Sequence, residues 1–368
     1  MGQRIITLDL LRGYFLFVIL IDHLARWPGF FELLTGRGWL WASAAEGFFI
    51  ISGIMVGVVR GKEMKQGKWL VAWKRLWSRG LVLYLWSISL TLLFTFVGYW
   101  LSDYAGIKPG IAEGLSNATL LWQTLTLQYV YGWADFLPWY AVFMIAAPLA
   151  LWLVYKRLAW LVVLISVLSW WMWRDTNSYF AWQILFFIGL VGGYYLQYFE
   201  TVYARVALPV KKKLMIWLSG ISIITLMASW SAIFISPTLT NHQDFGLAWM
   251  ASIRELATAW ANLANPWFGK WAMSPGRVLL SFLWFITLYL VIRYYETTIT
   301  RWVGKFLLPL GRNSLFVYGF QSIVIFAVAI LIPYTTSFVW NLLINVICLA
   351  LMWFVAKLWQ KYRQRIAT

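Results

Sequence analysis

The chain has 368 residues, of which 62% are hydrophobic and 12% charged, and its 30 Lys and Arg against 13 Asp and Glu give a net charge of +17. A water-soluble domain is roughly 45–50% apolar and about 25% charged, so this composition excludes a soluble globule, and a mean hydropathy of +0.72 excludes a disordered chain. A single Cys excludes a disulfide framework and a CxxC metal site, and no metal is expected.

Ten apolar stretches have about the length that a helix needs to cross a bilayer, which is roughly 20 residues. The first stretch lacks a small-residue cleavage site and carries ionisable side chains, so it is expected to remain in the mature protein rather than to be removed as a signal peptide. The ten stretches are residues 5–25, 39–60, 78–101, 135–155, 158–174, 179–199, 213–236, 275–294, 313–333 and 337–359.

Lys and Arg residues gather in alternate connecting segments. Twenty-two of the 30 basic residues fall in the segments on one side of the predicted helices, which include both termini, and seven fall on the other side. Because basic loops stay in the cytoplasm, both termini are predicted to be cytoplasmic, and the basic excess is attributed to topology rather than to nucleic-acid binding.

Two outer loops are long, at about residues 102–134 and 237–274. The helical spacing of residues 119–131 and 245–263 predicts interfacial helices within them. No internal repeat, low-complexity tract or detachable soluble segment is evident. The sequence therefore predicts an all-α integral membrane protein of about ten transmembrane helices, with residues 1–368 forming one polytopic domain.

The first predicted helix carries ionisable residues that are costly in lipid, at about 2.5–3.5 kcal/mol each. At 100° per residue, Arg12 and His23 lie within about 20° of one another, and Asp9 lies about 60° from Arg12. This stripe, with Leu16 between its polar members, is expected to face the protein interior. Arg12 and His23 are separated by about 16 Å along the helix axis, so they cannot contact one substrate atom together.

The second predicted helix carries Glu46 and Ser52, followed by Gly53 and Gly57. The two glycines have the small-xxx-small spacing that allows another helix to approach closely. An intramembrane carboxylate is a functional candidate, and the structural alternative for Glu46 is a salt bridge with Arg12 or Arg26.

Several stretches resemble the OpgC-type branch of the membrane acyltransferase-3 superfamily, in family order along nearly the whole chain. Arg12 and His23, with ten residues between them, match the Arg-x10-His signature of that superfamily. The similar stretches are RIITLDLLRGYFLFVILIDH, SAAEGFFIISGIMVGVVRG, KRLWSRGLVLYL, LPWYAVFMIAAPLALWL, SYFAWQILFFIGLVGGY, FGKWAMSPGRVLLSFL and LGRNSLFVYGFQS.

The resemblance implies a multi-pass enzyme of the bacterial inner membrane, with ten helices, a cytoplasmic acyl-CoA donor and an acceptor on the outer face. The type member succinylates osmoregulated periplasmic glucans, so succinyl-CoA is the expected donor and a periplasmic glucan the expected acceptor. Many broader relatives carry a His where this chain has Gln321, so a second-histidine role is not expected here.

The expected mechanism is O-acyl transfer with His23 as general base on an acceptor hydroxyl, since an ordinary histidine pKa of about 6.5 suits proton abstraction near neutral pH. Glu46 or Asp22 could orient the imidazole, and Arg12 could position the donor or balance its charge. A covalent acyl-enzyme on His23 or Ser52 stays open, as does a structural His23 bonded to a helix-end carbonyl.

The cytoplasmic donor and the outer acceptor have separate candidate binding residues. A basic inner entrance suits an anionic CoA thioester, although topology alone accounts for individual basic residues. The candidate donor-binding residues are Asp9, Ser52, Arg75, Arg79 and Arg312. Aromatic platforms with amides suit sugars, an Arg could also bind the free carboxylate of a succinyl group, and the alternative is an interfacial aromatic belt. The candidate acceptor-binding residues are Trp139, Tyr140, Trp182, Gln183 and Arg277.

A secondary transporter or flippase for a glycan or an anionic small molecule is the alternative function, because it would also carry intramembrane ionisable residues. Transporters commonly show inverted repeats and paired broken helices, and the sequence shows neither. The expected partners are acyl-CoA, a glycan acceptor and the lipid bilayer, without nucleic acid, and a homodimer stays open.

Overall fold

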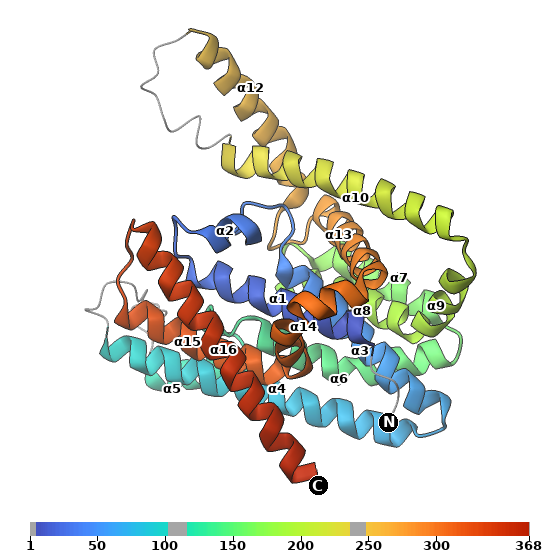
Figure 1. The fold of residues 1–368 in the computed structure, drawn as a ribbon. Helices are drawn as coiled ribbons and strands as arrows, with labels where there is room; N and C mark the ends of the chain where they lie inside the picture. The colour runs from blue at the N-terminus through green and yellow to red at the C-terminus, as the bar shows by residue number, and fades with distance from the viewer. Residues whose placement is uncertain (1–4, 102–115, 236–247, 368) are drawn as a thin grey trace. The chain divides into compact units, whose positions relative to one another are not determined.

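The computed structural model describes residues 5–101, 116–235 and 248–367, and every regular element in that part of the chain is a helix (Figure 1). The α-helices are α1 (Ile6–Leu24), α2 (Phe30–Thr35), α3 (Ala44–Lys65), α4 (Trp69–Trp100), α5 (Asn117–Leu125), α6 (Phe136–Tyr155), α7 (Ala159–Trp173), α8 (Ser178–Tyr194), α9 (Leu196–Arg205), α10 (Leu208–Trp230), α12 (Ala248–Ala264), α13 (Pro275–Tyr294), α14 (Glu296–Arg312), α15 (Ser314–Leu331) and α16 (Phe338–Ala367). A π-helical turn, η1 (Ser231–Ile235), and a 3₁₀ turn, η2 (Asn265–Phe268), complete them.

Each of the ten predicted stretches contains one long helix, because an apolar run of this length satisfies its backbone hydrogen bonds only as a helix. The largest difference is α4, which begins at Trp69 instead of residue 78. Lys74, Arg75 and Arg79 end the apolar run but not the helix, since Lys and Arg are good helix formers whose long stems can follow an apolar surface.

Among the described residues, seven helices are long and apolar enough to cross a membrane, or eight if α8 and α9 form one bent span. They are α3, α4, α6, α10 with η1, α13, α15 and α16. α7 has only 15 residues, and the 19 residues of α1 include Asp9, Arg12 and Asp22. The chain is therefore a multi-pass helical protein by length and hydropathy, while the count near ten and the side on which the termini lie stay predictions.

The predicted stretch 179–199 is divided by a bend of 60° between α8 and α9. Gly192 and Gly193 precede the bend, and glycine has a low helix propensity. It is a single bent pair among the described residues, whereas transporters commonly carry paired broken helices.

The two long loops that are predicted to be outer ones contain the two expected additional helices. α5 begins after Ser116, whose Oγ accepts the N–H of Thr119 at 3.1 Å as an N-cap, and it ends at Leu125 instead of residue 131. α12 covers the second predicted stretch from Ala248 onward, while residues 245–247 of that prediction lie outside the described residues.

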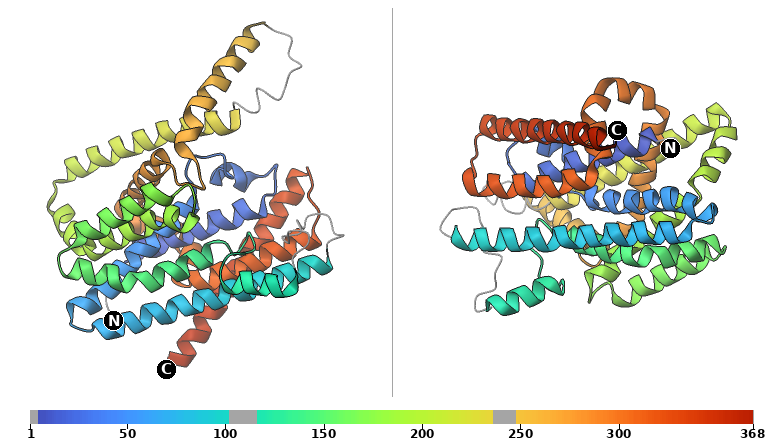
Figure 2. Two further views of the ribbon diagram at one scale, coloured as in Figure 1. Left: turned by 180° about the vertical axis from the view of Figure 1, so that it is seen from behind. Right: turned by 90° about the horizontal axis from the view of Figure 1, so that it is seen from below.

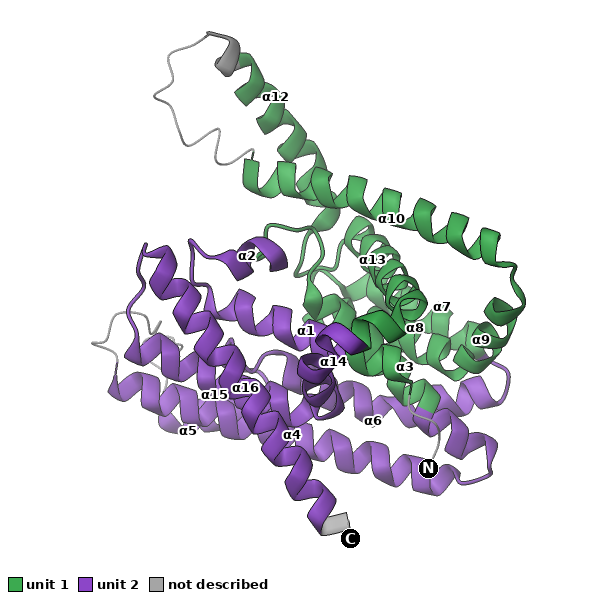
Figure 3. Ribbon diagram, in the orientation of Figure 1, with its two compact units in different colours: residues 1–11, 36–58, 159–300 green, residues 12–35, 59–158, 301–368 purple. Residues whose placement is uncertain are grey.

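The chain divides into two compact units, coloured in Figure 3. Unit 1 comprises residues 1–11, 36–58 and 159–300, and unit 2 comprises residues 12–35, 59–158 and 301–368. α1, α3 and α14 each begin in one unit and end in the other. Both units are thus built from segments far apart in the sequence.

In unit 1, α3 and α8 cross through small residues on both helices. A Cβ added to Gly53 or Gly57 would overlap the backbone of α8, and one added to Gly189 or Gly193 would overlap the backbone of α3. The predicted close approach at Gly53 and Gly57 is confirmed, and α8 carries the same spacing in return, so the two backbones meet without intervening side chains.

In unit 2, α4 and α6 run side by side, as Figure 2 shows. The α4 backbone at Gly80 lies near Ala141 of α6, where an added Cβ would lie 3.2 Å from the Ala141 carbonyl oxygen. α15 packs against both α4 and α16, and the rings of Phe94 and Phe326 stack at 4.5 Å between centroids. This apolar packing supports the helix α15, which carries several polar residues described next.

Candidate active site

The part of α1 that belongs to unit 2 runs alongside α15 in the same direction. Near the start of both helices, Arg12 Nη2 donates a hydrogen bond to Ser314 Oγ. Beyond the end of α1, Arg26 donates to the carbonyl oxygens of Val328 at 3.2 Å and Ile332 at 2.8 Å, at the end of α15. These contacts join the two helices at both ends.

His23 is held by its own helix. Its Nδ1 lies 2.7 Å from the carbonyl oxygen of Ile19, one turn earlier, so in the neutral ring Nδ1 carries the proton and Nε2 carries the lone pair. The imidazole is half-buried. This contact is the hydrogen bond to a carbonyl oxygen that a structural role for His23 predicts. It also leaves the lone pair on Nε2, as a general base requires.

Arg12 contacts the start of α15, next to Arg312 in the sequence, at the cytoplasmic end predicted for α1. Ser314, which accepts from Arg12, lies two residues after Arg312, and both guanidinium-bearing side chains are half-buried. Between them, Asn313 Nδ2 donates to the Pro309 carbonyl oxygen at 2.9 Å. The junction of α14 and α15 therefore carries Arg312 and is contacted by Arg12 through Ser314.

The other predicted basic donor residues are more exposed. Arg75 and Arg60 both bind Glu63 Oε1, at 2.5 and 2.6 Å, and the Arg75 side chain is 59% exposed. Arg79 is exposed on α4. An ion pair with this exposure contributes little to stability, and these residues add positive charge to the surface of unit 2.

Glu46 forms a buried ion pair in unit 1, and its partner is Arg277. Oε1 of Glu46 accepts Arg277 Nε at 2.6 Å, and the side chains are 1% and 6% exposed. Arg277 Nη1 also donates to the Phe268 carbonyl oxygen at 3.2 Å. The proposed structural alternative, a bridge from Glu46 to Arg12 or Arg26, was wrong, because Arg12 binds Ser314 and Arg26 caps α15.

The same carboxylate caps α3. Glu46 Oε2 accepts the Ser43 N–H at 2.7 Å and the Ser43 hydroxyl at 2.6 Å, which satisfies one of the unpaired donors at the helix start. The sequence SAAE at residues 43–46 has the Ser-x-x-Glu spacing of a capping box, a signal that would have predicted this role.

Beside the ion pair, aromatic rings form a compact cluster at this end of unit 1. Trp41 stacks on Phe268 at 3.9 Å between centroids with a 4° angle between planes. Trp41 Nε1 donates to Asn265 Oδ1 at 3.0 Å. Because Arg277 binds the Phe268 carbonyl, the ion pair and the cluster share one anchor in η2.

Four of the predicted acceptor-binding residues are interior ones: Trp139, Tyr140, Trp182 and Gln183 are 7%, 5%, 0% and 6% exposed. Gln183 joins α8 to α7, since its Oε1 accepts from Ser166 Oγ at 2.6 Å and its Nε2 donates to the Ser166 carbonyl oxygen at 2.7 Å. The Gln183 amide thereby satisfies its hydrogen bonds within the protein.

Three more predicted residues have less specific settings. Asp9 is 7% exposed and belongs to unit 1, as does the half-buried Ser52, which precedes Gly53 at the α3–α8 crossing. Asp22 is half-buried in unit 2 beside His23 in the sequence. The stripe on α1 consists of buried and half-buried side chains, as does the rest of that helix.

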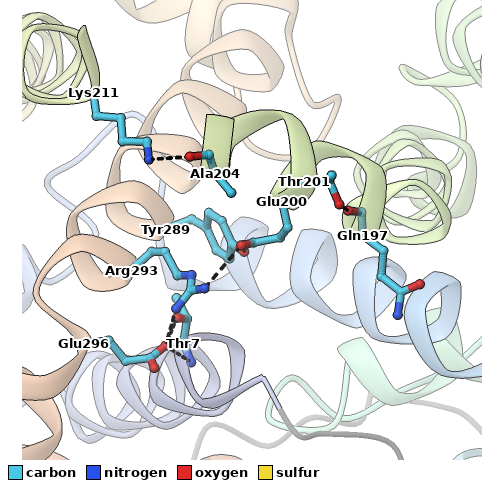
Figure 4. A network of polar contacts seen from close by, with 9 residues as sticks. All are labelled: Thr7, Gln197, Glu200, Thr201, Ala204, Lys211, Tyr289, Arg293 and Glu296. Atoms are coloured by element: carbon cyan, nitrogen blue, oxygen red, sulfur yellow. Dashed lines mark hydrogen bonds and ion pairs between the residues drawn. The ribbon is translucent and has the colours of Figure 1, made fainter. Parts of the chain in front are cut away.

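A polar network in unit 1, which the sequence did not indicate, ties the start of α1 to α13 and α9 (Figure 4). Glu200 of α9 accepts from the Tyr289 hydroxyl and pairs with Arg293 at 3.3 Å. Arg293 also pairs with Glu296, which accepts the Thr7 N–H at 3.1 Å. A carboxylate at this position interacts favourably with the positive end of the α1 dipole.

The structure thus brings together Arg12 and Ser314 in unit 2, and Glu46 and Arg277 in unit 1. The predicted catalytic residues are divided between the units, with His23, Arg12 and Asp22 in unit 2 and Glu46 in unit 1. Within the described part of the chain, no group of three or more His, Cys, Asp and Glu side chains could hold a metal ion.

A family model described as OpgC protein matches residues 4–364, which is nearly the whole chain. No curated protein and no solved structure matches the chain.

Proposed function

The chain belongs to the OpgC protein family, and from this premise we propose that it is a membrane acyltransferase that modifies a glucan. The proposed donor is a cytoplasmic acyl-CoA, with succinyl-CoA as the first choice, and the proposed acceptor is a hydroxyl group of a periplasmic glucan. The proposed location is the bacterial inner membrane with both termini in the cytoplasm. It is supported by seven apolar helices of membrane-spanning length in the described part of the chain and by the distribution of basic residues.

The observation that carries the proposal is the contact between His23 Nδ1 and the Ile19 carbonyl oxygen at 2.7 Å. A general base must have an unprotonated nitrogen with a defined direction. The carbonyl keeps the proton on Nδ1 and orients the ring, so Nε2 is the basic atom. This arrangement needs no carboxylate beside the imidazole. The Glu46 carboxylate is bound to Arg277 instead.

The reaction is direct transfer. His23 Nε2 takes the proton of the acceptor hydroxyl as its oxygen attacks the thioester carbonyl, and the C–S bond breaks when the tetrahedral intermediate collapses. The imidazolium returns the proton to the departing CoA thiolate. The products are a glucan ester and free CoA, and the base is regenerated without an oxidant or reductant.

The donor is proposed to enter between Arg12 and Arg312. Guanidinium groups suit phosphates and carboxylates because they donate several hydrogen bonds from one plane. Arg12 lies about 16 Å from His23 along the helix axis, which suits an extended donor whose anionic part lies at one end and whose reacting carbon lies at the other. Asp9 and Ser52 remain proposed donor contacts. Arg75 and Arg79 are proposed to attract the anionic donor by their positive charge.

On the acceptor side the proposal keeps Trp139, Tyr140, Trp182, Gln183 and Arg277 as residues that shape the acceptor region. Their burial favours an indirect role, in which they support the helices that line the region. Glu46 occupies Arg277 Nε and Nη2 at 2.6 Å, so a succinyl carboxylate would have to compete with a bound carboxylate for this guanidinium.

The test is an assay of the purified full chain in liposomes with succinyl-CoA and a linear or cyclic glucan. Free thiol and ester-linked succinyl groups should appear together, and His23→Ala should abolish both while the protein still inserts into the bilayer. Movement of intact glucan without thiol release would instead support the transporter alternative. Full activity of His23→Ala would remove the general-base role.

A further inference from the structure

Gln321 on α15 is a buried amide whose hydrogen bonding is incomplete. Its side chain is 1% exposed, and its Oε1 atom has no hydrogen-bond partner among the described residues. A buried acceptor without a partner is unfavourable, and the great majority of buried side-chain polar atoms have one. In native proteins an ordered water or a bound ligand supplies the partner of such an atom.

The position of Gln321 along α15 follows from contacts already described. Ser314, Gln321 and Val328 are spaced by seven residues. Each is rotated by about 20° around the helix axis relative to the one before, so all three lie on one face of the helix. The Ser314 side chain on this face binds Arg12 of α1, and the backbone carbonyls at the other end of α15 bind Arg26, just beyond the end of α1. The face that carries Gln321 is therefore the one directed toward α1 in unit 2.

The approximate level of Gln321 along α1 follows from the same contacts. The step from Ser314 to Gln321 is about 10.5 Å, and so is the step from Arg12 to Ile19. Since α1 and α15 run in the same direction, Gln321 lies level with Ile19, whose carbonyl oxygen holds His23. The unpartnered amide oxygen is thus about one helical turn from the level of the proposed base.

Neighbouring polar groups on α15 are already satisfied. Ser322 Oγ lies within hydrogen-bond distance of two carbonyl oxygens, those of Trp133 at 3.0 Å and Tyr318 at 3.1 Å, and can donate to either. Ser322 is as buried as Gln321, at 2% exposed, so burial does not by itself leave polar groups on this helix without a partner.

We propose that Gln321 is an acceptor-positioning residue, whose Oε1 accepts a hydrogen bond from a hydroxyl group of the glycan. A carbonyl-type oxygen can accept from a hydroxyl but cannot serve the acyl carbonyl, which offers no donor. The contact orients the sugar so that a second hydroxyl faces His23. This inference rests on the proposed function, because it assigns a residue to the acceptor of that reaction.

The test compares Gln321→Leu with wild type in the liposome assay. The KM for glucan should rise about tenfold, as expected for one lost neutral hydrogen bond, while the KM for succinyl-CoA stays unchanged. Thermal stability should not fall, because the variant removes an amide whose oxygen has no partner in the folded protein. A purely structural residue would show the opposite, with lower stability and no selective change in the KM for glucan.

Two further variants complete the test. Gln321→Glu retains acceptor oxygens and should move the acid limb of the pH–rate profile to higher pH, since a nearby carboxylate favours the imidazolium form of His23. Ser322→Ala, the matched control, should keep the wild-type KM for both substrates. Unchanged glucan KM in Gln321→Leu would overturn the inference alone, whereas absence of thiol release by the wild-type protein would overturn it together with the proposed function.

Discussion

Oε1 of Glu46 lies 2.6 Å from Nη2 of Arg277 in unit 1, and both side chains are almost completely excluded from solvent. An ion pair of this kind is stabilising only while both members are present, since either charge alone would be buried without compensation. The pair links the start of α3 to the start of α13, and it also supports the Trp41–Phe268 stack through the Phe268 carbonyl.

Glu46→Gln should therefore lower the free energy of unfolding by about 3–5 kcal/mol, as found when one partner of a buried pair is removed. The double variant Glu46→Leu, Arg277→Leu should recover much of this loss, because it leaves no unpaired charge. Thermal unfolding in detergent measures both. If the double variant regains stability and also activity, Glu46 is structural; regained stability without activity would assign one of the two residues to the reaction.

His23→Asn separates the two roles of the imidazole. The Asn amide can donate to the Ile19 carbonyl in place of Nδ1, but it has no basic atom in place of Nε2. We expect His23→Asn to have lost at least 100-fold in kcat, within the range of about 10²–10⁴ for general base catalysis, with stability close to wild type. Retained turnover in this variant would show that the hydrogen bond, rather than the base, is what the enzyme requires.

The α3–α8 crossing offers a matched pair of neighbouring glycines. Gly193→Ala should destabilise the protein by about 1–3 kcal/mol, as overpacking does, because its Cβ would overlap the backbone at Ile54. Gly192 has no atom within 4 Å of an added Cβ, so Gly192→Ala should be neutral or stabilising by up to about 1 kcal/mol. Equal melting temperatures for the two variants would contradict the close helix contact.

The Arg12–Ser314 contact predicts where the donor is bound. Arg12→Lys keeps the charge but loses the planar donor set, and it should raise the KM for acyl-CoA about tenfold, or about 1.4 kcal/mol. Arg75→Ala should change this KM less than twofold at physiological salt, because its exposed charge is screened. A larger effect from Arg75 than from Arg12 would move the donor site to the surface of α4.

Cysteine labelling can establish the topology, because Cys348 is the chain's single cysteine and is buried. In a Cys348→Ser background, a cysteine at Lys212 should react with an impermeant maleimide only after the membrane is opened, and one at Lys270 should react in intact cells. This pattern follows from the retention of basic loops in the cytoplasm. The reverse pattern would invert the proposed donor and acceptor sides.

Much of the helical architecture follows from the sequence, because long apolar runs leave the backbone few alternatives to a helix. The ten predicted stretches all contain helices, and the stripe of Asp9, Arg12 and His23 follows from helical periodicity alone. The Gly53–Gly57 spacing likewise predicted a close helix contact, although the partner helix could not be identified without knowing which segments pack together.

Helix ends were less predictable than helix existence. α4 extends past its basic residues, and α14, an additional helix, follows α13 directly. Charges mark where an apolar stretch ends, but they do not stop a helix whose hydrogen bonds continue. The bend after α8 depends on packing at its end, which local composition does not determine.

The partners of the polar residues were decided by tertiary structure. Glu46 and Arg277 are 231 positions apart, and Arg12 and Ser314 are 302 apart, so no local pattern could select these pairs from the other charges of the chain. Composition and periodicity determined that this protein is helical, apolar and polar along one stripe of α1. Only the folded chain determined which side chains satisfy one another, because a buried charge is matched by whichever group the packing of distant helices brings within hydrogen-bond distance.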